Sequence, residues 1–265
     1  MPDPIVELSY ADFRRAESLC CAIPHNRAIV YAVLEGHSPG RVFVDQPDSP
    51  ACALLYPEGA YFYVAGDENN EEFCGALPSL LFDRLSPLLA EPELVLFPFT
   101  PAWQRKLELL LGERGVITIR RKIFHFNPQR FALQNGWRSR MPEGFRLQPI
   151  DSSLVIRQPA FQPLLDPATQ RFGFAILYGE QIASACTAVF VGGGEAEIDI
   201  FTEEAYRGRG LATLAACAFI EECQSRGLIP AWSCWPEREA SWALALKLGF
   251  EECPDAPALL WAEGM

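Results

Sequence analysis

A glycine-containing turn is the part of the chain best suited to bind a phosphorylated ligand. Its residues are Tyr206-Arg207-Gly208-Arg209-Gly210-Leu211-Ala212. The two glycines lack a Cβ, so a bulky anion can approach the backbone closely. A helix that starts here directs unpaired N–H groups and the positive end of its dipole at that anion. We therefore expect the amides of residues 208–212 to bind a phosphate-bearing anion.

Two carboxylates precede this turn and are candidates for a general base. Glu197 and Asp199 lie in a stretch, 197–202, that alternates polar and apolar residues and so predicts a strand. Residues two apart on a strand share a face, and a carboxylate there can bind an ammonium and accept its proton. Both also fit plain solvated strand positions. Glu203 and Glu204 are interpreted as surface charges.

The elements around the turn follow from hydrophobic periodicity. Apolar residues at i, i+3, i+4, i+7 and i+8 from Leu211 predict an amphipathic helix that ends near Gly227. Residues 230–235 then predict a short strand. A second helix begins at Pro236 and is closed by Gly249, which is well placed for a left-handed cap.

The turn resembles the acyl-CoA loop of the GNAT superfamily of N-acetyltransferases, whose signature is Gln/Arg-x-x-Gly-x-Gly/Ala. Arg207, Gly210 and Ala212 fill that signature here, and the strand–turn–helix context agrees with it. The pattern does not match a dinucleotide loop, because position 213 is Thr where G-x-G-x-x-G needs Gly. The resemblance implies that the loop amides of residues 208–212, Leu211 among them, hold the pyrophosphate of acetyl-CoA, with positive charge from Arg207, Arg209 and Arg238. It also favours Glu197 over Asp199 as the base, because a Glu at this offset from the loop resembles GNAT members with a glutamate base.

The second helix also resembles its GNAT counterpart, with two departures. The chain keeps Ser241 and the run 247–250, Lys-Leu-Gly-Phe. It has Arg238 where Asn is usual and Ala245 where Tyr is frequent. In the family this Tyr is the usual candidate to protonate the departing CoA thiolate, so that acid is missing here. The resemblance implies that Arg238 and Ser241 lie beside the cofactor.

The whole length is similar to a two-part branch of GNAT-like acetyltransferases that includes zwittermicin A resistance proteins. The segments that carry this likeness are 41–45, 66–70, 172–174, 197–202, 206–212 and 230–234. In GNAT proteins the strand before the loop splays from its neighbour. By that resemblance, freed N–H groups around Ile200, Phe201 and Thr202 would hold the thioester carbonyl.

Composition limits the class of protein and its partners. The chain has 265 residues, 49% of them hydrophobic and 21% charged, which is typical of a globular protein long enough for two domains. A net charge of −12 argues against nucleic acid and suits a cationic substrate. We see no secretory signal and no membrane span, and expect a cytoplasmic protein. Oligomeric state is not predictable.

The nine cysteines predict reduced, mostly buried thiols rather than a metal site. No pair has C-x-x-C spacing, and an odd count does not suit a disulfide framework. We expect no metal. Cys234 ends the strand beside the expected acyl site, but core packing is the favoured interpretation because no His is near it in sequence to activate it.

The predicted fold class is α+β. Residues 136–265 should form a GNAT domain, a mixed, mostly antiparallel sheet flanked by helices. Its strands are expected at 145–149, 172–178, 181–190, 195–201 and 259–262. The proline-rich passage 158–167 is expected to form a rim over the substrate. Residues 1–135 should form a smaller domain, a degenerate copy of the same fold without the glycine loop. Its helices are expected near 11–21, 26–35, 71–89 and 101–111, and its strands at 41–44, 51–56, 61–65, 94–97 and 116–126.

Two functions remain open at this point. The first is an acetyl-CoA-dependent N-acetyltransferase that acts on a small amine by direct attack in a ternary complex. The second, motivated by Arg238 and Ala245, is an inactive CoA-binding regulatory or interaction module.

Overall fold

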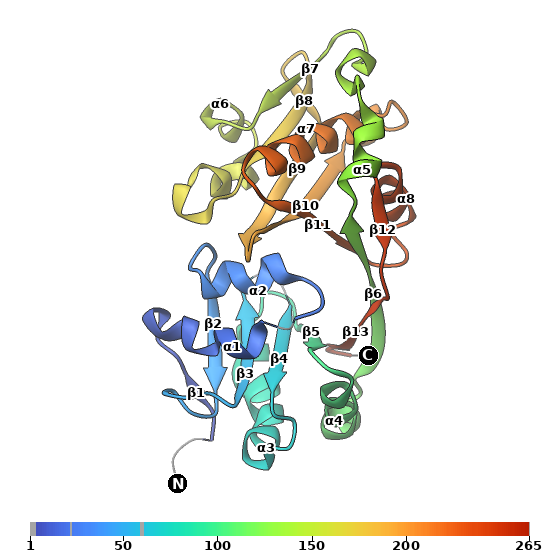
Figure 1. Cartoon of the computed structure of the whole chain (residues 1–265). Coiled ribbons are helices and arrows are strands. Elements are labelled where there is room, and N and C mark those ends of the chain that lie inside the picture. Colours follow the sequence, from blue (N-terminus) through green and yellow to red (C-terminus); the bar gives the residue numbers. More distant parts are fainter. Residues whose placement is uncertain (1–3, 22, 59–60, 265) are drawn as a thin grey trace. The chain divides into compact units, whose positions relative to one another are not determined.

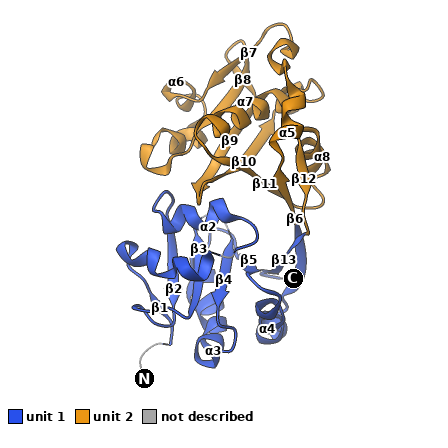
Figure 2. Ribbon diagram, viewed as in Figure 1, with its two compact units in different colours: residues 1–121, 255–265 blue, residues 122–254 orange. Residues whose placement is uncertain are grey.

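The computed structural model describes residues 4–21, 23–58 and 61–264. It divides the chain into two compact units, Met1–Arg121 with Asp255–Met265, and Lys122–Pro254 (Figure 2). The sequence predicted a boundary near residue 135. The boundary between the two units lies earlier in the chain, between Arg121 and Lys122. The reason is that the polar stretch after residue 127 carries Phe131 and Trp137, which are both buried in the core of unit 2. The last strand, expected in the second domain, belongs to unit 1.

Unit 2 is built on a mixed sheet in which one neighbouring pair of strands is parallel. The strand order is β7-β8-β9-β10-β11-β6-β12, and β10 and β11 are the parallel pair (Figure 1). The strands are β7 Phe145–Pro149, β8 Gly173–Tyr178, β9 Gln181–Gly192, β10 Glu195–Thr202, β11 Ile229–Cys234, β12 Phe250–Glu252 and the second half of β6 Ile117–Phe126. The three-residue β12 was missed from sequence because it is too short to show periodicity.

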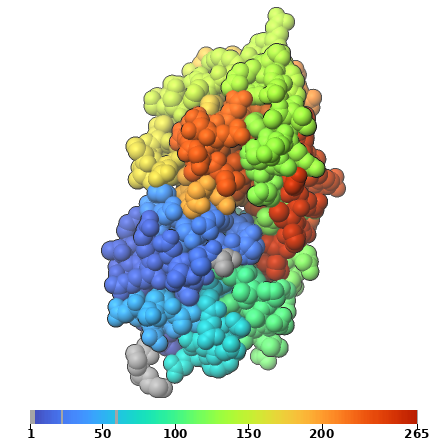
Figure 3. All heavy atoms as spheres, viewed as in Figure 1, coloured from blue at the N-terminus to red at the C-terminus, as the bar shows by residue number. Residues whose placement is uncertain are grey.

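Helices cover both faces of this sheet. On one face, α7 (Leu211–Ser225) packs across β8, β9 and β10. There it shares an apolar core with α8 (Glu239–Lys247) and α5 (Pro128–Phe131). The atoms of residues 128–140, green in Figure 3, lie directly beside the orange atoms of α7, and the Trp137 indole donates to Glu221 of that helix at 2.7 Å.

The other face carries a smaller apolar cluster under the proline-rich passage. The helix α6 (Ser152–Val155) and the 3-10 helices Pro159–Leu165 and Pro167–Thr169 replace any long helix there, as the prolines predict. Phe161 packs in this cluster, and its ring centroid lies 6.4 Å from that of Phe201 on β10. The cluster therefore covers the Phe201 end of that face of the sheet.

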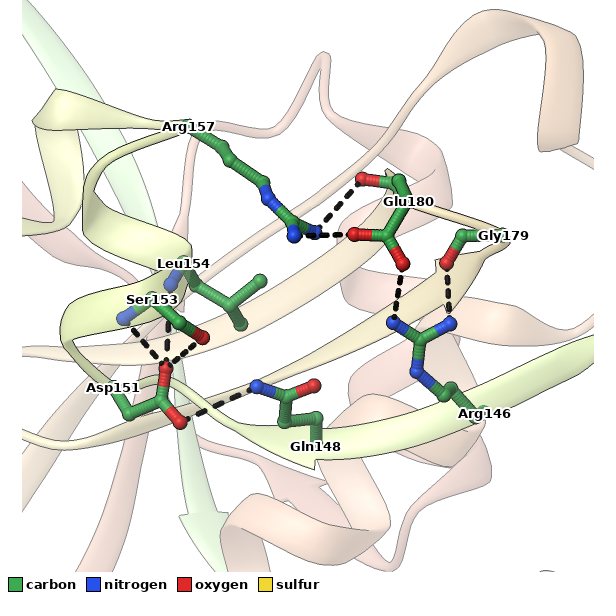
Figure 4. A network of polar contacts seen from close by, with 8 residues as sticks. All are labelled: Arg146, Gln148, Asp151, Ser153, Leu154, Arg157, Gly179 and Glu180. Carbon is green, nitrogen blue, oxygen red and sulfur yellow. Dashed lines mark hydrogen bonds and ion pairs between the residues drawn. The ribbon is translucent and has the colours of Figure 1, made fainter.

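A polar network fixes this covering segment to the sheet (Figure 4). Asp151 caps α6 by accepting the N–H groups of Ser153 and Leu154 at 2.9 and 3.2 Å. The hydroxyl of Ser153 donates to the same carboxylate and, together with these N–H groups, lowers the pKa of Asp151. Glu180, in the β8–β9 turn, is paired with both Arg146 and Arg157. Through these two ion pairs, the β8–β9 turn connects β7 to the chain that follows α6.

Unit 1 has the same order of strands as unit 2. The order is β1-β2-β3-β4-β5-β13-β6, and β4 and β5 are parallel. Its elements are β1 Val6–Glu7, β2 Gly40–Val44, β3 Cys52–Pro57, β4 Phe62–Gly66, β5 Glu93–Pro98, β13 Ala256–Ala262, the first half of β6, α1 Glu17–Cys20, α2 Arg27–Leu34, α3 Glu71–Ser79 and α4 Pro101–Leu111. The segment β4–α3–β5 corresponds to β10–α7–β11. The fold confirms an α+β, mixed and mostly antiparallel architecture with two parts.

The strand β6 contributes to both sheets. Its residues 117–121 pair with β13 in unit 1, and its residues 122–126 pair with β11 and β12 in unit 2. In each sheet the strand next to the parallel pair thus comes from a distant part of the chain.

The glycine after α8 is predicted to be essential for packing. Gly249 has φ +93°, and a Cβ there would lie 2.5 Å from the backbone nitrogen of Phe131. Gly249→Ala should therefore destabilise unit 2 by about 2–3 kcal/mol, through backbone strain and a clash with backbone that cannot move freely. Urea unfolding followed by tryptophan fluorescence measures this change.

The matched control is Gly227→Ala at the end of α7. Gly227 has φ +71°, but a Cβ there meets no described atom within 4 Å, so strain alone, about 1 kcal/mol, is expected. Equal destabilisation by the two substitutions would contradict the packing argument.

Candidate active site

The glycine turn joins β10 to α7 and leaves the start of that helix open. Gly208 and Gly210 have φ +75° and +77°, which residues with a Cβ rarely adopt. A Cβ on either would meet no described atom within 4 Å. Gly210 is the N-cap of α7, and no described side chain caps the helix there. The first N–H groups of α7, from Leu211 and Ala212 onward, are thus available to an anion.

Contacts on the β10 side hold the turn in place. The Tyr206 hydroxyl donates to Gln181 Oε1 at 2.5 Å, and its ring packs against Phe145 and Tyr178. The Nε of Arg207 donates to the carbonyl of Thr202 at 3.3 Å. The Arg207 side chain therefore holds the turn in place and also contributes positive charge. Both Arg207 and Arg209 are exposed.

The parallel strands β10 and β11 separate beside this turn. Their described pairing runs from Glu195–Ile229 to Glu197–Ala231. Beyond it, residues 198–202 stay paired with β9, whereas residues 232–234 pair with β6. One edge of β10 is consequently free to bind a ligand along residues 198–202.

The register decides which backbone groups point into this opening. Glu203 N–H donates to the Ala183 carbonyl at 2.9 Å, which makes alternate residues of β10 the hydrogen-bonded positions toward β9. The N–H groups of Ile200 and Thr202 then point away from β9. Phe201, which was also expected to offer its N–H, lies opposite Ala185 in a hydrogen-bonded pair instead. Its ring packs against the cluster on the covered face.

The two candidate bases differ in their surroundings. Ala196 and Ile198 pack in the α7 core, so Glu197 and Asp199 lie on the opposite face of β10. Glu197 is 4% exposed and accepts a hydrogen bond from the Ser233 hydroxyl at 2.6 Å. Asp199 is exposed. The buried carboxylate thus lies at the point where the strands separate.

The remaining predicted contacts lie at the start of α8. This helix begins at Glu239, later than predicted, because residues 235–238 form a turn in which Arg238 N–H donates to the Trp235 carbonyl. The Arg238 side chain is exposed. The Ser241 hydroxyl accepts the indole N–H of Trp232 at 3.1 Å and keeps its own proton for another acceptor. Ala245 is fully buried.

The corresponding place in unit 1 is built differently. Asn70 caps α3 through its side chain, which accepts Phe73 N–H at 3.1 Å, and Asp45 in turn accepts from Asn70. The first turn of α3 carries two glutamates, Glu71 and Glu72. The pairing of β4 with β5 continues to Val64, whose carbonyl also accepts the N–H of Phe99. This helix start is already capped and negatively charged, so it does not suit a pyrophosphate.

The cysteines lie mostly in the interior. None of the nine, all within the described residues, forms a disulfide, and seven are buried, Cys234 among them. Burial raises the pKa of Cys20, Cys52 and Cys217 to about 12, which makes these thiols poor nucleophiles. Within the described ranges there is no group of three or more His, Cys, Asp or Glu able to bind a metal. None of the helices described has both the length and the apolar character to cross a membrane.

Comparison with known proteins identifies the family. A model of the GNAT acetyltransferase family matches residues 19–255. The chain is 31% identical over 233 residues to the uncharacterized N-acetyltransferase YdfB of Bacillus subtilis (strain 168), and the match covers 84% of this chain and 85% of that one. This chain therefore belongs to the GNAT acetyltransferase family and is an N-acetyltransferase of that type.

Solved structures agree over nearly the full length. A GCN5-related N-acetyltransferase-like protein from Streptococcus suis 89/1591 is similar with a TM-score of 0.68 and 25% identity, covering 96% of this chain and all of that one. A tandem GNAT protein from the clavulanic acid biosynthesis pathway has a TM-score of 0.67 at 13% identity, with 98% of both chains covered. The second likeness concerns the fold and matches the two-part arrangement of units seen here.

Proposed function

We propose that this protein transfers the acetyl group of acetyl-CoA to a small amine by direct attack in a ternary complex. The observation that carries the proposal is the coincidence of two features in unit 2. An uncapped helix start with two positive-φ glycines follows a strand whose free edge carries unused N–H groups. The first feature suits the pyrophosphate of CoA, and the second suits its thioester carbonyl.

Each loop residue has a definite part in this proposal. The amides of residues 208–212 bind the pyrophosphate. Arg207 and Arg209 add local positive charge to a chain whose net charge is −12. One of the outward N–H groups of Ile200 and Thr202 binds the carbonyl oxygen and stabilises the anion that develops on it, because N–H groups two residues apart on a strand, about 6.6 Å, are too far apart to share one oxygen. Arg238 and Ser241 supply further contacts to the cofactor from the start of α8.

The reaction moves one acetyl group and one proton. The amine nitrogen, in its neutral form, attacks the thioester carbon, the C–S bond breaks, and CoA leaves as a thiolate. Glu197 takes the proton that the amine loses, directly or through one water. Ala245 has no acidic hydrogen to give the thiolate, so solvent protonates it. We favour Glu197 over Asp199 because its carboxylate is buried at the separation of the strands.

The acceptor is proposed to be a polar, cationic amine. The net charge of −12 attracts such a molecule, and Glu197 and Asp199 together give the face of β10 opposite α7 a negative character. The likeness to zwittermicin A resistance proteins points in the same direction, toward an aminopolyol. The rim over this face is the proline-rich segment that includes Phe161.

A panel of amines assayed by release of free CoA thiol tests the function. We expect turnover on at least one polar amine and none after Gly210→Trp, because a side chain at that position occupies the space of the pyrophosphate. Gly227→Trp is the matched control, since Gly227 has a similar φ and equally open surroundings at the other end of α7. Acetyl-CoA binding without turnover on any amine class would instead favour the CoA-binding module.

The base is tested on whichever amine is turned over. Glu197→Gln should lower kcat by roughly 10²–10⁴-fold and leave acetyl-CoA affinity nearly unchanged, because residue 197 is distant along the strand from the loop amides. The wild-type pH–rate profile should show a rising limb that the variant loses. Asp199→Asn is the comparison. If it abolishes turnover while Glu197→Gln does not, the base is two residues further along the same face.

A further inference from the structure

The buried carboxylate of Glu197 is tied to the neighbouring strand by the hydroxyl of Ser233. Ser233 Oγ donates to Glu197 Oε1 at 2.6 Å. The two residues are 36 positions apart in sequence and come from β10 and β11. Buried carboxylates need hydrogen-bond donors, and a hydroxyl donor to a carboxylate makes a short, strong bond.

Ser233 makes this contact from the part of β11 that lies beyond its pairing with β10. The last β10–β11 pair is Glu197 with Ala231, so Ser233 is two residues into the part of β11 that has left β10. There β11 pairs with β6, with Ser233 opposite Ile123. A strand that is held on its other side thus presents the hydroxyl across the opening. The contact fixes one oxygen of Glu197.

We infer that Ser233 is a positioning residue for the Glu197 carboxylate, an inference that rests on the proposed function. Its hydroxyl keeps its proton throughout the reaction. It orients the carboxylate toward the attacking amine, and it favours the charged form of the group, which is the form able to accept a proton. Ser233→Ala removes this hydroxyl and should therefore impair proton transfer without disturbing the cofactor loop.

Charged side chains also lie on or beside the strands next to Glu197. Glu195 and Asp199 flank it on β10, and the residues facing it on β11, Ala231 and Ser233, are uncharged. On β9 it lies opposite Phe190, whose ring carries the Arg171 guanidinium 5.3 Å from its centroid. Substitution at 233 leaves all of these charges in place, so a displaced pH profile would report the lost hydroxyl.

The test is a mutant cycle on the best amine of the panel. Ser233→Ala should lower kcat about 10- to 100-fold, the range expected for a lost hydrogen bond to a charged group, with the KM for acetyl-CoA unchanged. The acid limb of its pH–rate profile should move to higher pH, because the carboxylate then protonates more easily. Ser233→Thr keeps the hydroxyl and should restore most of the rate. In the Glu197→Gln background, Ser233→Ala should have little further effect.

The outcomes separate this inference from the proposed function. A large effect of Glu197→Gln with no effect of Ser233→Ala, or with effects that simply multiply, overturns the role of Ser233 and leaves the base in place. A loss of rate in Ser233→Ala with an unmoved pH profile also overturns it, since that is a structural defect. Full activity of Glu197→Gln removes the base itself, and the role of Ser233 with it.

Discussion

The separation of β10 from β11 after Glu197 and Ala231 is the feature on which the site depends. Parallel neighbours normally satisfy each other's backbone groups along their whole length. Here the described pairing of β10 with β11 stops at Glu197 and Ala231, while β11 continues alongside β6. One edge of β10 therefore keeps its N–H groups for a ligand. The separation also brings together the buried carboxylate and the open end of α7, because β10 runs directly into the glycine turn.

The two units show how little of the chemistry follows from topology alone. Both have the same strand order and a helix between parallel strands, yet the local residues differ. In unit 1, Asn70 caps α3, and the β4–β5 pairing continues to Val64, which leaves neither an open helix start nor a comparable free edge. In unit 2, glycines at 208 and 210 leave the helix start uncapped. Among the described residues, the same fold therefore carries the features of an anion site at the helix start of unit 2 and lacks them at the corresponding helix of unit 1.

Local signals in the sequence predicted most of the elements, including the turn and the strand that carry the candidate site. The helix α4 was predicted with the bounds it has, because Pro101 marks its start clearly. The turn at 206–212 and the strands β8 to β10 were recognisable from glycines and alternation. Contacts between distant segments were not. Nothing local shows that β6 divides between two sheets, that β13 returns to unit 1, or that Ser233 meets Glu197. The direction of the Phe201 N–H depends on register, which the sequence does not contain.

Hydrogen–deuterium exchange with and without acetyl-CoA tests the central claim most directly. The account predicts slower exchange in two segments of unit 2, the loop and first turn of α7 at 208–213 and the free edge of β10 at 198–202. It predicts no change at 67–73 of unit 1, where the helix is already capped. Protection of the unit 1 segment, or no protection of the glycine loop at saturating acetyl-CoA, would contradict the account.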